Sequence, residues 1–290
     1  MKPQSRVWRW RMITGTLFLV LGLLVIICST IGPAQISPVD VLAMLLRKVP
    51  WVGSIVPRGD WPQSHETIIF QMRLARVILA VLVGAGLASS GVVLQGLLQN
   101  SLADPYILGI SSGAALGATV AMLFGLGAHV LGVFALPLIA FAGAVVTAFS
   151  VYNLARVGGR VQVSTLILAG IAVGSFLSAV TSYLMITGGQ NIHQVVFWLM
   201  GGLAGRGWDH VAVLAPYIVI GLAIMLLNVR NLNAMLLGDE PAQHLGIDVE
   251  RLKQVMLMAA TLTAAAAVAV SGAIGFVGLI IPHAVRLVVG

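Results

Sequence analysis

One short stretch of the sequence has the residue pattern of a catalytic nucleophile. Gly109–Gly113 reads GISSG and fits G-x-S-x-G, which in hydrolases presents a serine on a sharp turn between a strand and a helix. Here the stretch lies in an apolar segment in which Gly109, Gly113 and Gly117 recur at every fourth position, the spacing of a small-residue face in membrane helix packing. We therefore expect Ser111 to lie in a packing interface, and we predict no catalytic residue.

A second stretch, LLGDEPAQHLGI (Leu236–Ile247), concentrates acidic side chains between two hydrocarbon-rich segments. Charged residues make up 9% of the chain, yet four carboxylates lie within twelve positions: Asp239, Glu240, Asp248 and Glu250. Asp239 is a plausible N-cap, Gly246 suits the left-handed residue that ends a helix, and Asp248 can cap a second helix. The stretch is therefore predicted to form two short helices with a glycine elbow, either as an ordinary solvated loop or as a docking surface.

Composition decides which solvent surrounds these stretches. The mean hydropathy is +1.03, and 59% of the residues are hydrophobic, which is far from a soluble domain. The formal charge of +7 comes from only 16 Lys and Arg residues that form no basic stripe, so nucleic acid is not an expected partner. Because Cys28 is the only cysteine, an internal disulfide and a cysteine-based metal cluster are excluded, and no cofactor is predicted.

Apolar windows long enough to cross about 30 Å of hydrocarbon recur along the chain. They lack period-2 alternation, which favours helices over a barrel. We predict an all-α multi-pass membrane protein with eight spans, at Met12–Ile31, Val77–Leu98, Tyr106–Leu126, Val133–Leu154, Val163–Ile186, Val211–Leu227, Val255–Val270 and Ile274–Val289. The first span could be a signal peptide, but its apolar run is long and no small-residue cleavage site follows, so an uncleaved anchor is expected. A short amphipathic helix is predicted at VDVLAMLLRK, after Ser37 and Pro38.

The distribution of Lys and Arg predicts the orientation in the cytoplasmic membrane. With a cytoplasmic N-terminus, the inner segments hold Lys2, Arg6, Arg9, Arg11, Arg156, Arg160, Arg230, Arg251 and Lys253. The outer segments hold Arg206 and a long first loop with Arg47, Lys48, Arg58, Arg73 and Arg76. This bias, weakened by that loop, places Leu236–Ile247 in the cytoplasm.

The source of energy is predicted to lie in another polypeptide. From Val77 to Val270 no predicted span contains Asp, Glu, Lys or Arg, whereas ion-coupled transporters usually carry such groups as relays. None of the three lysines, Lys2, Lys48 and Lys253, stands in a G-x-x-x-x-G-K-[ST] motif, so the chain has no P-loop. An ion-coupled secondary transporter remains the alternative, and it predicts uptake that survives ATP depletion.

Five ordered motifs resemble a known family of importer permeases. Arg73–Gly117, Ser164–Gly174, Trp198–Trp208, LGDEPAQHLGI and Gly272–Leu287 resemble, in order, the FecCD-type permeases of type II ABC importers for iron-siderophore, haem and cobalamin. The resemblance covers nearly the whole chain. It implies a single permease domain over residues 1–290, and as partners a cytoplasmic ATPase, a periplasmic or lipid-anchored substrate-binding protein, a second permease subunit forming a homo- or heterodimer, and membrane lipid.

The same resemblance implies roles for individual residues. Residues 236–253 correspond to coupling helices that seat in the ATPase, with Leu237, Gly238, Glu240, Pro241, Ala242, Leu245 and Gly246 as contact or elbow positions. Arg73 and Arg76 match arginines that dock the binding protein, although Ala75 replaces a proline between them. Snorkelling of these arginines to the membrane interface is the alternative.

The resemblance also implies a cytoplasmic gate. Asn100 and Leu102 match it in the turn QNSLADP, and Ser164 matches a second constriction. An Asn and a Leu at such a turn could plug a pore with apolar bulk, or could form a tight connection with a satisfied amide, and the residues alone favour neither.

A weak internal echo indicates an inverted repeat. Arg73-Leu74 and Ser90-Gly91 recur as Arg251-Leu252 and Ser271-Gly272, and the two copies begin on opposite sides of the membrane. The family continues through two more helices, ten in all, so the sequence is expected to lack the last two helices of the bundle, which would put transport by this chain alone in doubt.

Overall fold

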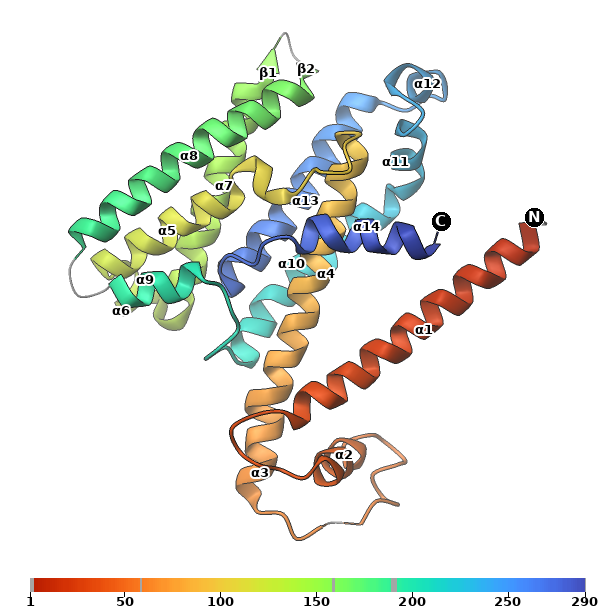
Figure 1. Cartoon of the computed structure of the whole chain (residues 1–290), viewed down its shortest axis with the longest axis vertical. Helices are drawn as coiled ribbons and strands as arrows, with labels where there is room; N and C mark the ends of the chain where they lie inside the picture. The colour runs from red at the N-terminus through yellow and green to blue at the C-terminus, as the bar shows by residue number, and fades with distance from the viewer. Residues whose placement is uncertain (1–2, 58, 158–159, 189–191, 290) are drawn as a thin grey trace. The chain divides into compact units, whose positions relative to one another are not determined.

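The fold of the chain is given by a computed structural model that describes residues 3–57, 59–157, 160–188 and 192–289. Almost all of these residues are helical (Figure 1). The α-helices are α1 (Pro3–Thr30), α2 (Pro38–Arg47), α3 (Gln63–Thr67), α4 (Leu74–Leu97), α5 (Ile110–Phe124), α6 (Ala128–Leu131), α7 (Ala135–Ala155), α8 (Val163–Thr187), α9 (Ile192–Leu199), α10 (Trp208–Leu227), α11 (Val229–Met235), α12 (Asp239–His244), α13 (Val249–Ser271) and α14 (Val277–Val289). A π-helical segment, η1 (Ile68–Arg73), joins α3 to α4, and 3₁₀ turns form η2 (Pro105–Leu108) and η3 (Gly132–Phe134). An antiparallel pair of two-residue strands, β1 (Arg156–Val157) and β2 (Arg160–Val161), precedes α8.

The prediction of a helical multi-pass membrane protein is confirmed. Six segments of the described chain are long and apolar enough to cross a membrane: Trp8–Thr30, Gln63–Leu97, His129–Ala155, Val163–Thr187, Trp208–Leu227 and Val249–Ser271. The other two predicted spans are also apolar helices, but α5 has 15 residues and α14 has 13, fewer than the roughly 20 that cross the hydrocarbon. Their predicted N-terminal parts are not α-helical because Gly109 (φ +72°) and Phe276 (φ +68°) turn the backbone into the left-handed region.

Contacts divide the chain into two units. Unit 1 comprises Met1–Val81, Ala204–Ala212 and Leu287–Gly290, and unit 2 comprises Leu82–Leu203 and Val213–Arg286.

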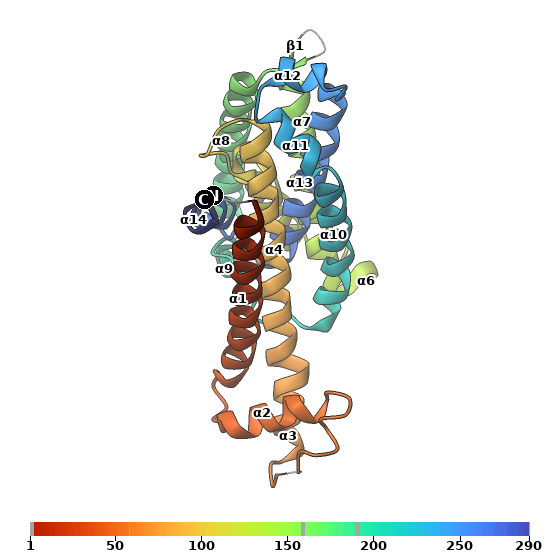
Figure 2. The ribbon, with the colours of Figure 1, turned by 90° about the vertical axis from the view of Figure 1, so that its right-hand side faces the viewer.

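Unit 1 holds α2 against the start of the long helix Gln63–Leu97, as Figure 2 shows for α2 and α3. The amphipathic helix predicted after Ser37 is confirmed as α2, although the Ser37 side chain makes no capping hydrogen bond. Val41 and Met44 on its inner face are buried in a small apolar core with Ile36, Trp61 and Ile69. Burial of this face stabilises α2 more than its cap does.

Unit 2 is packed through small residues, as the glycine spacing in GISSG predicts. A Cβ on Gly113 would lie 2.5 Å from the carbonyl oxygen of Gly143 in α7, and one on Gly117 would lie 2.6 Å from that of Ile139. The backbones of α5 and α7 can approach so closely only because these positions lack side chains. The central helix of the unit is α13, and 78% of its apolar window is buried. The GISSG stretch therefore serves packing.

Candidate functional site

The predicted two-helix element is present, with one cap reassigned. Gly246 ends α12 at φ +80°, and the Asp248 carboxylate caps α13 by accepting a hydrogen bond from the Arg251 N–H at 3.1 Å. The predicted N-cap Asp239 is wrong by one position, because α12 is capped by Gly238 (φ 112°) and Asp239 is its first helical residue. The second helix is not a separate short one, since VERLKQVM forms the first turns of the 23-residue α13.

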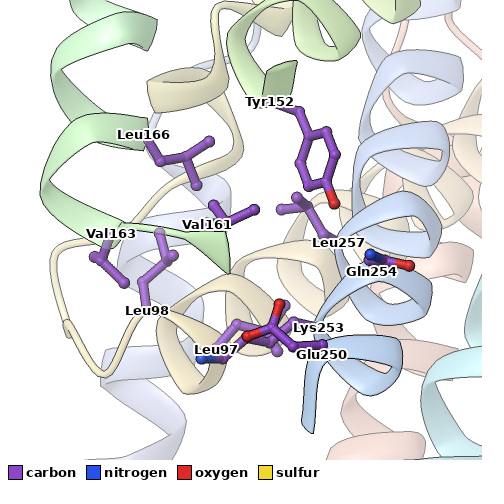
Figure 3. Close-up of a pocket in the computed structure, with 10 residues that line it drawn as sticks. All are labelled: Leu97, Leu98, Tyr152, Val161, Val163, Leu166, Glu250, Lys253, Gln254 and Leu257. Atoms are coloured by element: carbon purple, nitrogen blue, oxygen red, sulfur yellow. The ribbon is translucent and has the colours of Figure 1, made fainter. Parts of the chain in front are cut away.

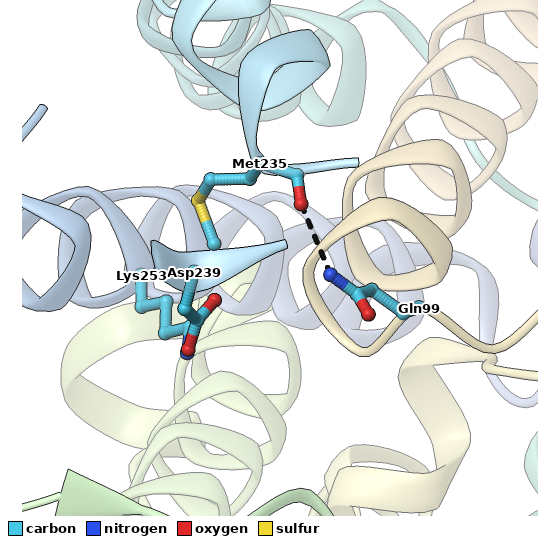
Figure 4. Close-up of polar contacts among 4 residues, drawn as sticks. All are labelled: Gln99, Met235, Asp239 and Lys253. Atoms are coloured by element: carbon cyan, nitrogen blue, oxygen red, sulfur yellow. Dashed lines mark hydrogen bonds and ion pairs between the residues drawn. The ribbon is translucent and has the colours of Figure 1, made fainter. Parts of the chain in front are cut away.

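Two polar contacts fix this element within unit 2 (Figure 4). The Asp239 carboxylate lies 2.5 Å from the Lys253 ammonium and so links α12 to α13 across the Gly246 elbow. The Gln99 side-chain amide donates to the Met235 carbonyl at 3.0 Å, which joins the end of α11 to the turn after α4. Neither pairing is predicted by the sequence, because the partners are far apart along the chain.

The residues assigned to ATPase coupling differ in exposure. Leu237 and Leu245 are 70% and 66% exposed, and Glu240 and Pro241 are also exposed. Ala242 is fully buried, so its methyl group anchors α12 and is not on the outer surface of the element. The element thus presents Leu237, Leu245 and the Glu240 carboxylate on its outer surface, while Ala242 is buried on its inner side.

The turn assigned to the gate is tightly hydrogen-bonded. The Asn100 side-chain carbonyl accepts from the Leu102 N–H at 2.9 Å, and the Asn100 backbone carbonyl accepts from the Ala103 N–H at 3.1 Å. The amide is therefore satisfied locally, as the tight-connection alternative requires. The Leu102 side chain is 68% exposed and free to project from the turn, as a plug requires. The geometry is compatible with both interpretations at once.

A small cavity in unit 2 joins the two predicted constrictions to the two-helix element (Figure 3). Leu97 and Leu98 line it just before the turn with Asn100, and Val163 and Leu166 line it on either side of the exposed Ser164. Glu250, Lys253 and Gln254 close it from the first turns of α13. The cavity therefore brings together residues beside the two predicted constrictions and the start of α13, which are far apart in sequence.

The sequence analysis does not single out Asp104 and Tyr106, although Asp before Pro is a recognisable capping signal. The Asp104 carboxylate accepts from the Tyr106 N–H at 2.8 Å, and the Tyr106 hydroxyl donates to the Ile274 carbonyl at 2.6 Å. Burial raises the pKa of Asp104, an effect that the hydrogen bond from Tyr106 partly offsets. This pair ties the turn after α4 to the irregular segment between α13 and α14.

The two arginines assigned to docking lie in different environments within unit 1. Arg73 is 7% exposed, and its guanidinium donates to the carbonyls of Ser29, Thr30 and Ala34 at 3.2, 2.7 and 2.5 Å. It thus caps the C-terminus of α1, where a cation is favoured by the helix dipole. Arg76 is half-buried, and its Nε has no hydrogen-bond partner among the described residues. Arg76 is the more exposed of the two side chains, although its own Nε is buried.

The chain matches known proteins along most of its length. A family model described as the FecCD transport family matches residues 18–290. The cobalamin import permease BtuC of Halobacterium salinarum is 47% identical over 79% of this chain, an alignment that spans 61% of that protein. The Fe(3+)-citrate import permease YfmE of Bacillus subtilis is 39% identical over 94% of this chain and 78% of that protein. The hemin transport permease HmuU of Yersinia pestis is 40% identical over 77% of this chain and 67% of that protein.

A solved structure supports the same assignment. It is an inward-facing conformation of a metal-chelate type ABC transporter, with a TM-score of 0.78 and 31% identity, and it covers 97% of this chain and 82% of that chain. The family match extends over most of the chain, and the five sequence motifs lie on the helices and turns described above. The chain belongs to the FecCD transport family.

Proposed function

We propose that the chain is a permease subunit of an ATP-binding-cassette importer that moves an iron chelate, haem or cobalamin across the cytoplasmic membrane. The substrate class rests on relatives named for cobalamin, Fe(3+)-citrate and hemin import. The choice among these substrates is a matter for transport measurements. The chain itself is not an enzyme, and ATP is hydrolysed by a separate subunit.

The arrangement around Gln99 carries this proposal. The two-helix element is connected to the turn that holds Asn100 by the bond from Gln99 to the Met235 carbonyl, and to α13 by the Asp239–Lys253 pair. An ATPase that pushed on Leu237 and Leu245 would move a braced element, and the force would reach the turn through few contacts. A solvated loop without a mechanical role has no need of these braces.

The positions of the basic residues support a cytoplasmic location for this end of unit 2. Figures 1 and 2 place the strand pair and α12 at the same end of the unit. Arg156 lies on β1, Arg230 on α11, and Arg251 and Lys253 on the first turn of α13. Their accumulation at one end follows the bias of positive residues toward the cytoplasm. The N-terminus is proposed to lie on that side too.

A second permease subunit is proposed to cover part of α8. Only 11% of the apolar window of this helix is buried within the chain, and its exposed residues include Ser175, Ser178 and Ser182. Hydroxyl groups on a spanning helix are better accommodated against protein or a water-filled path than against lipid. A homo- or heterodimer with α8 near the shared path would cover this exposed face, on which the Ser178 hydroxyl pairs with that of Ser112 and the Ser182 hydroxyl donates to the Ser178 carbonyl.

Reconstituted transport tests the function. The chain, its ATPase, its second subunit and its binding protein would be placed in proteoliposomes, and uptake of radiolabelled cobalamin, haem and ferric citrate would be measured. We expect uptake of one substrate class to require ATP inside the vesicles with correct subunit orientation and to be insensitive to an uncoupler. Uptake that persists without ATP and stops with an uncoupler would establish the ion-coupled secondary transporter in its place.

A further inference from the structure

The segment between α2 and α3 contains an ordered loop, Val49–Val56, with exposed apolar side chains. Trp51 and Ile55 are 91% and 80% exposed. The loop is held by its own hydrogen bonds, from the Gly53 N–H to the Val49 carbonyl and from the Ile55 N–H to the Val52 carbonyl, both at 3.0 Å. The Arg47 guanidinium closes it by donating to the Val56 carbonyl at 3.0 Å. The apolar side chains are thus displayed by a preorganised structure.

Trp51 is displayed at a conformational cost. Its φ of +72° lies in the left-handed region, which bulky side chains rarely adopt. Such strain persists where the surrounding structure enforces it, and it clusters at active sites, ligand clamps and switch regions. Trp51 is therefore both strained and exposed, and its side chain is not part of the apolar core of unit 1.

The base of the loop carries two cations without a carboxylate partner. Arg47 and Lys48 line a cavity of about 300 Å³ with Met44, Gln63, Glu66 and Phe70. The Glu66 carboxylate accepts from the Trp61 indole at 2.9 Å, and Lys48 lies 5.5 Å from the centre of the Phe70 ring. Within the described residues, the ion pair formed is the one between Lys253 and Asp239. Arg47 and Lys48 therefore have no carboxylate oxygen within 4 Å among those residues. The rim of the loop is therefore complementary to an acidic surface.

Lipid is poorly placed to cover the loop. The outer end of α1 is marked by Arg73, which binds the Ser29 and Thr30 carbonyls. From Arg73 the helix continues ten residues to Gln63, or about 15 Å at 1.5 Å per residue. Figures 1 and 2 show the segment between α2 and α3 at that extremity of unit 1. A headgroup layer is only about 5–8 Å thick, so with Arg73 at the hydrocarbon boundary the Gln63 end of the helix would lie beyond it.

We propose that Val49–Val56 is a docking element for the extracytoplasmic substrate-binding protein. Trp51 and Ile55 enter an apolar depression on that protein, and Lys48 meets carboxylates at its rim. Large aromatic anchors surrounded by charged residues are typical of the centre of a protein interface. The inference rests on the proposed importer function, which supplies the partner, and it adds a contact separate from Arg76.

Binding to the purified binding protein, with the full chain in nanodiscs, tests the proposal. We expect Trp51→Ala with Ile55→Ala to weaken the affinity at least about tenfold, and Lys48→Glu to slow association and reduce its salt dependence. The matched control is Leu19→Ala with Val20→Ala on α1, which removes side chains that are 63% and 42% exposed and should leave the affinity unchanged. Normal affinity in the loop variant, with weaker binding in Arg76→Glu, would overturn the docking loop and retain the importer. Absence of binding by the wild-type chain would remove both.

A labelling experiment guards against misfolded variants and against other occupants. Cys28 is the only cysteine, so Cys28→Ser gives a cysteine-free background in which Trp51→Cys carries the single thiol. We expect a membrane-impermeant maleimide to label this thiol in nanodiscs and the binding protein to protect it. A thiol that is already inaccessible without the binding protein would assign the loop to lipid or to a second copy of the chain and would contradict the proposal.

Discussion

The carboxylate of Asp239 and the ammonium of Lys253 lie 2.5 Å apart across the Gly246 elbow. Their side chains are 48% and 21% exposed, so the pair is only partly shielded from water. A pair of this kind stabilises a fold by less than about 1 kcal/mol, but it fixes the angle between two helices. The pair therefore contributes little to stability, and we propose that its role is to hold α12 against α13.

Charge exchange at this pair gives the first prediction. Asp239→Lys alone should uncouple ATP hydrolysis from uptake while changing the thermal midpoint little, because it places two ammonium groups together. Asp239→Lys combined with Lys253→Asp should restore part of the coupling by re-forming the pair. Both are measured as substrate molecules imported per ATP hydrolysed. Equal uncoupling in the single and double variants would show that the pair does not brace the element.

Gly246 gives the second prediction. Gly246→Val should abolish co-purification of the ATPase and ATP-driven uptake, because a β-branched residue is strongly disfavoured at φ +80°. A Cβ there meets no atom within 4 Å, so the effect comes from the backbone and not from a clash. Gly246→Asn should be milder, since Asn tolerates the left-handed region.

The matched control for Gly246 is Gly22→Val in α1, where a Cβ also meets nothing within 4 Å and φ is not positive. This variant should insert and transport normally. Wild-type uptake by a well-expressed Gly246→Val variant would remove residues 236–253 from the coupling role.

Arg73 and Arg76, the two arginines predicted to dock the binding protein, give the third prediction. Arg73→Met should lower the free energy of unfolding by at least about 2 kcal/mol, because three hydrogen bonds from a buried charge to the end of α1 are lost. Arg76→Gln should change stability little and weaken association with the binding protein. Thermal unfolding in detergent and binding in nanodiscs separate the two effects. Weak binding by a stable Arg73→Met variant, with normal binding by Arg76→Gln, would instead assign docking to Arg73.

Asp104 gives the fourth prediction, which concerns pH. Because burial raises its pKa, the folded state binds more protons than the unfolded state above the ordinary value of 3.8, and stability falls as pH rises through the folded pKa. Asp104→Asn keeps an acceptor for the Tyr106 N–H and removes the buried charge. The variant should therefore unfold at a higher temperature than the wild type at neutral pH.

The thermal advantage of Asp104→Asn should shrink as the pH falls through the raised pKa of Asp104, because the wild-type carboxyl then loses its charge. Tyr106→Phe, which removes the hydroxyl bound to the Ile274 carbonyl, should be destabilising at every pH tested. An advantage of Asp104→Asn that did not depend on pH would show that desolvation of the charge is not its cause.

The features that could be predicted from the residues alone are those that depend on neighbours along the chain. Apolar runs predicted the helices, and glycine spacing predicted a packing face on α5, whose partner proved to be α7. Gly246 and Asp248 predicted an elbow and a cap that the structure contains. Each of these follows from backbone conformation or hydrophobicity within a few residues. The absence of a P-loop likewise needs no structure.

Which side chains remain exposed at the candidate sites depends on the packing of distant segments and could not be predicted from the residues alone. Arg73 and Arg76 look equivalent in sequence, but Arg73 is buried because the end of α1, some forty residues earlier, supplies its acceptors. Ala242 shares a motif with exposed Leu245 yet is fully buried. Asp239, which was expected to cap α12, instead forms an ion pair with Lys253. Burial and pairing depend on segments that approach only after folding, so residue type and spacing cannot specify them.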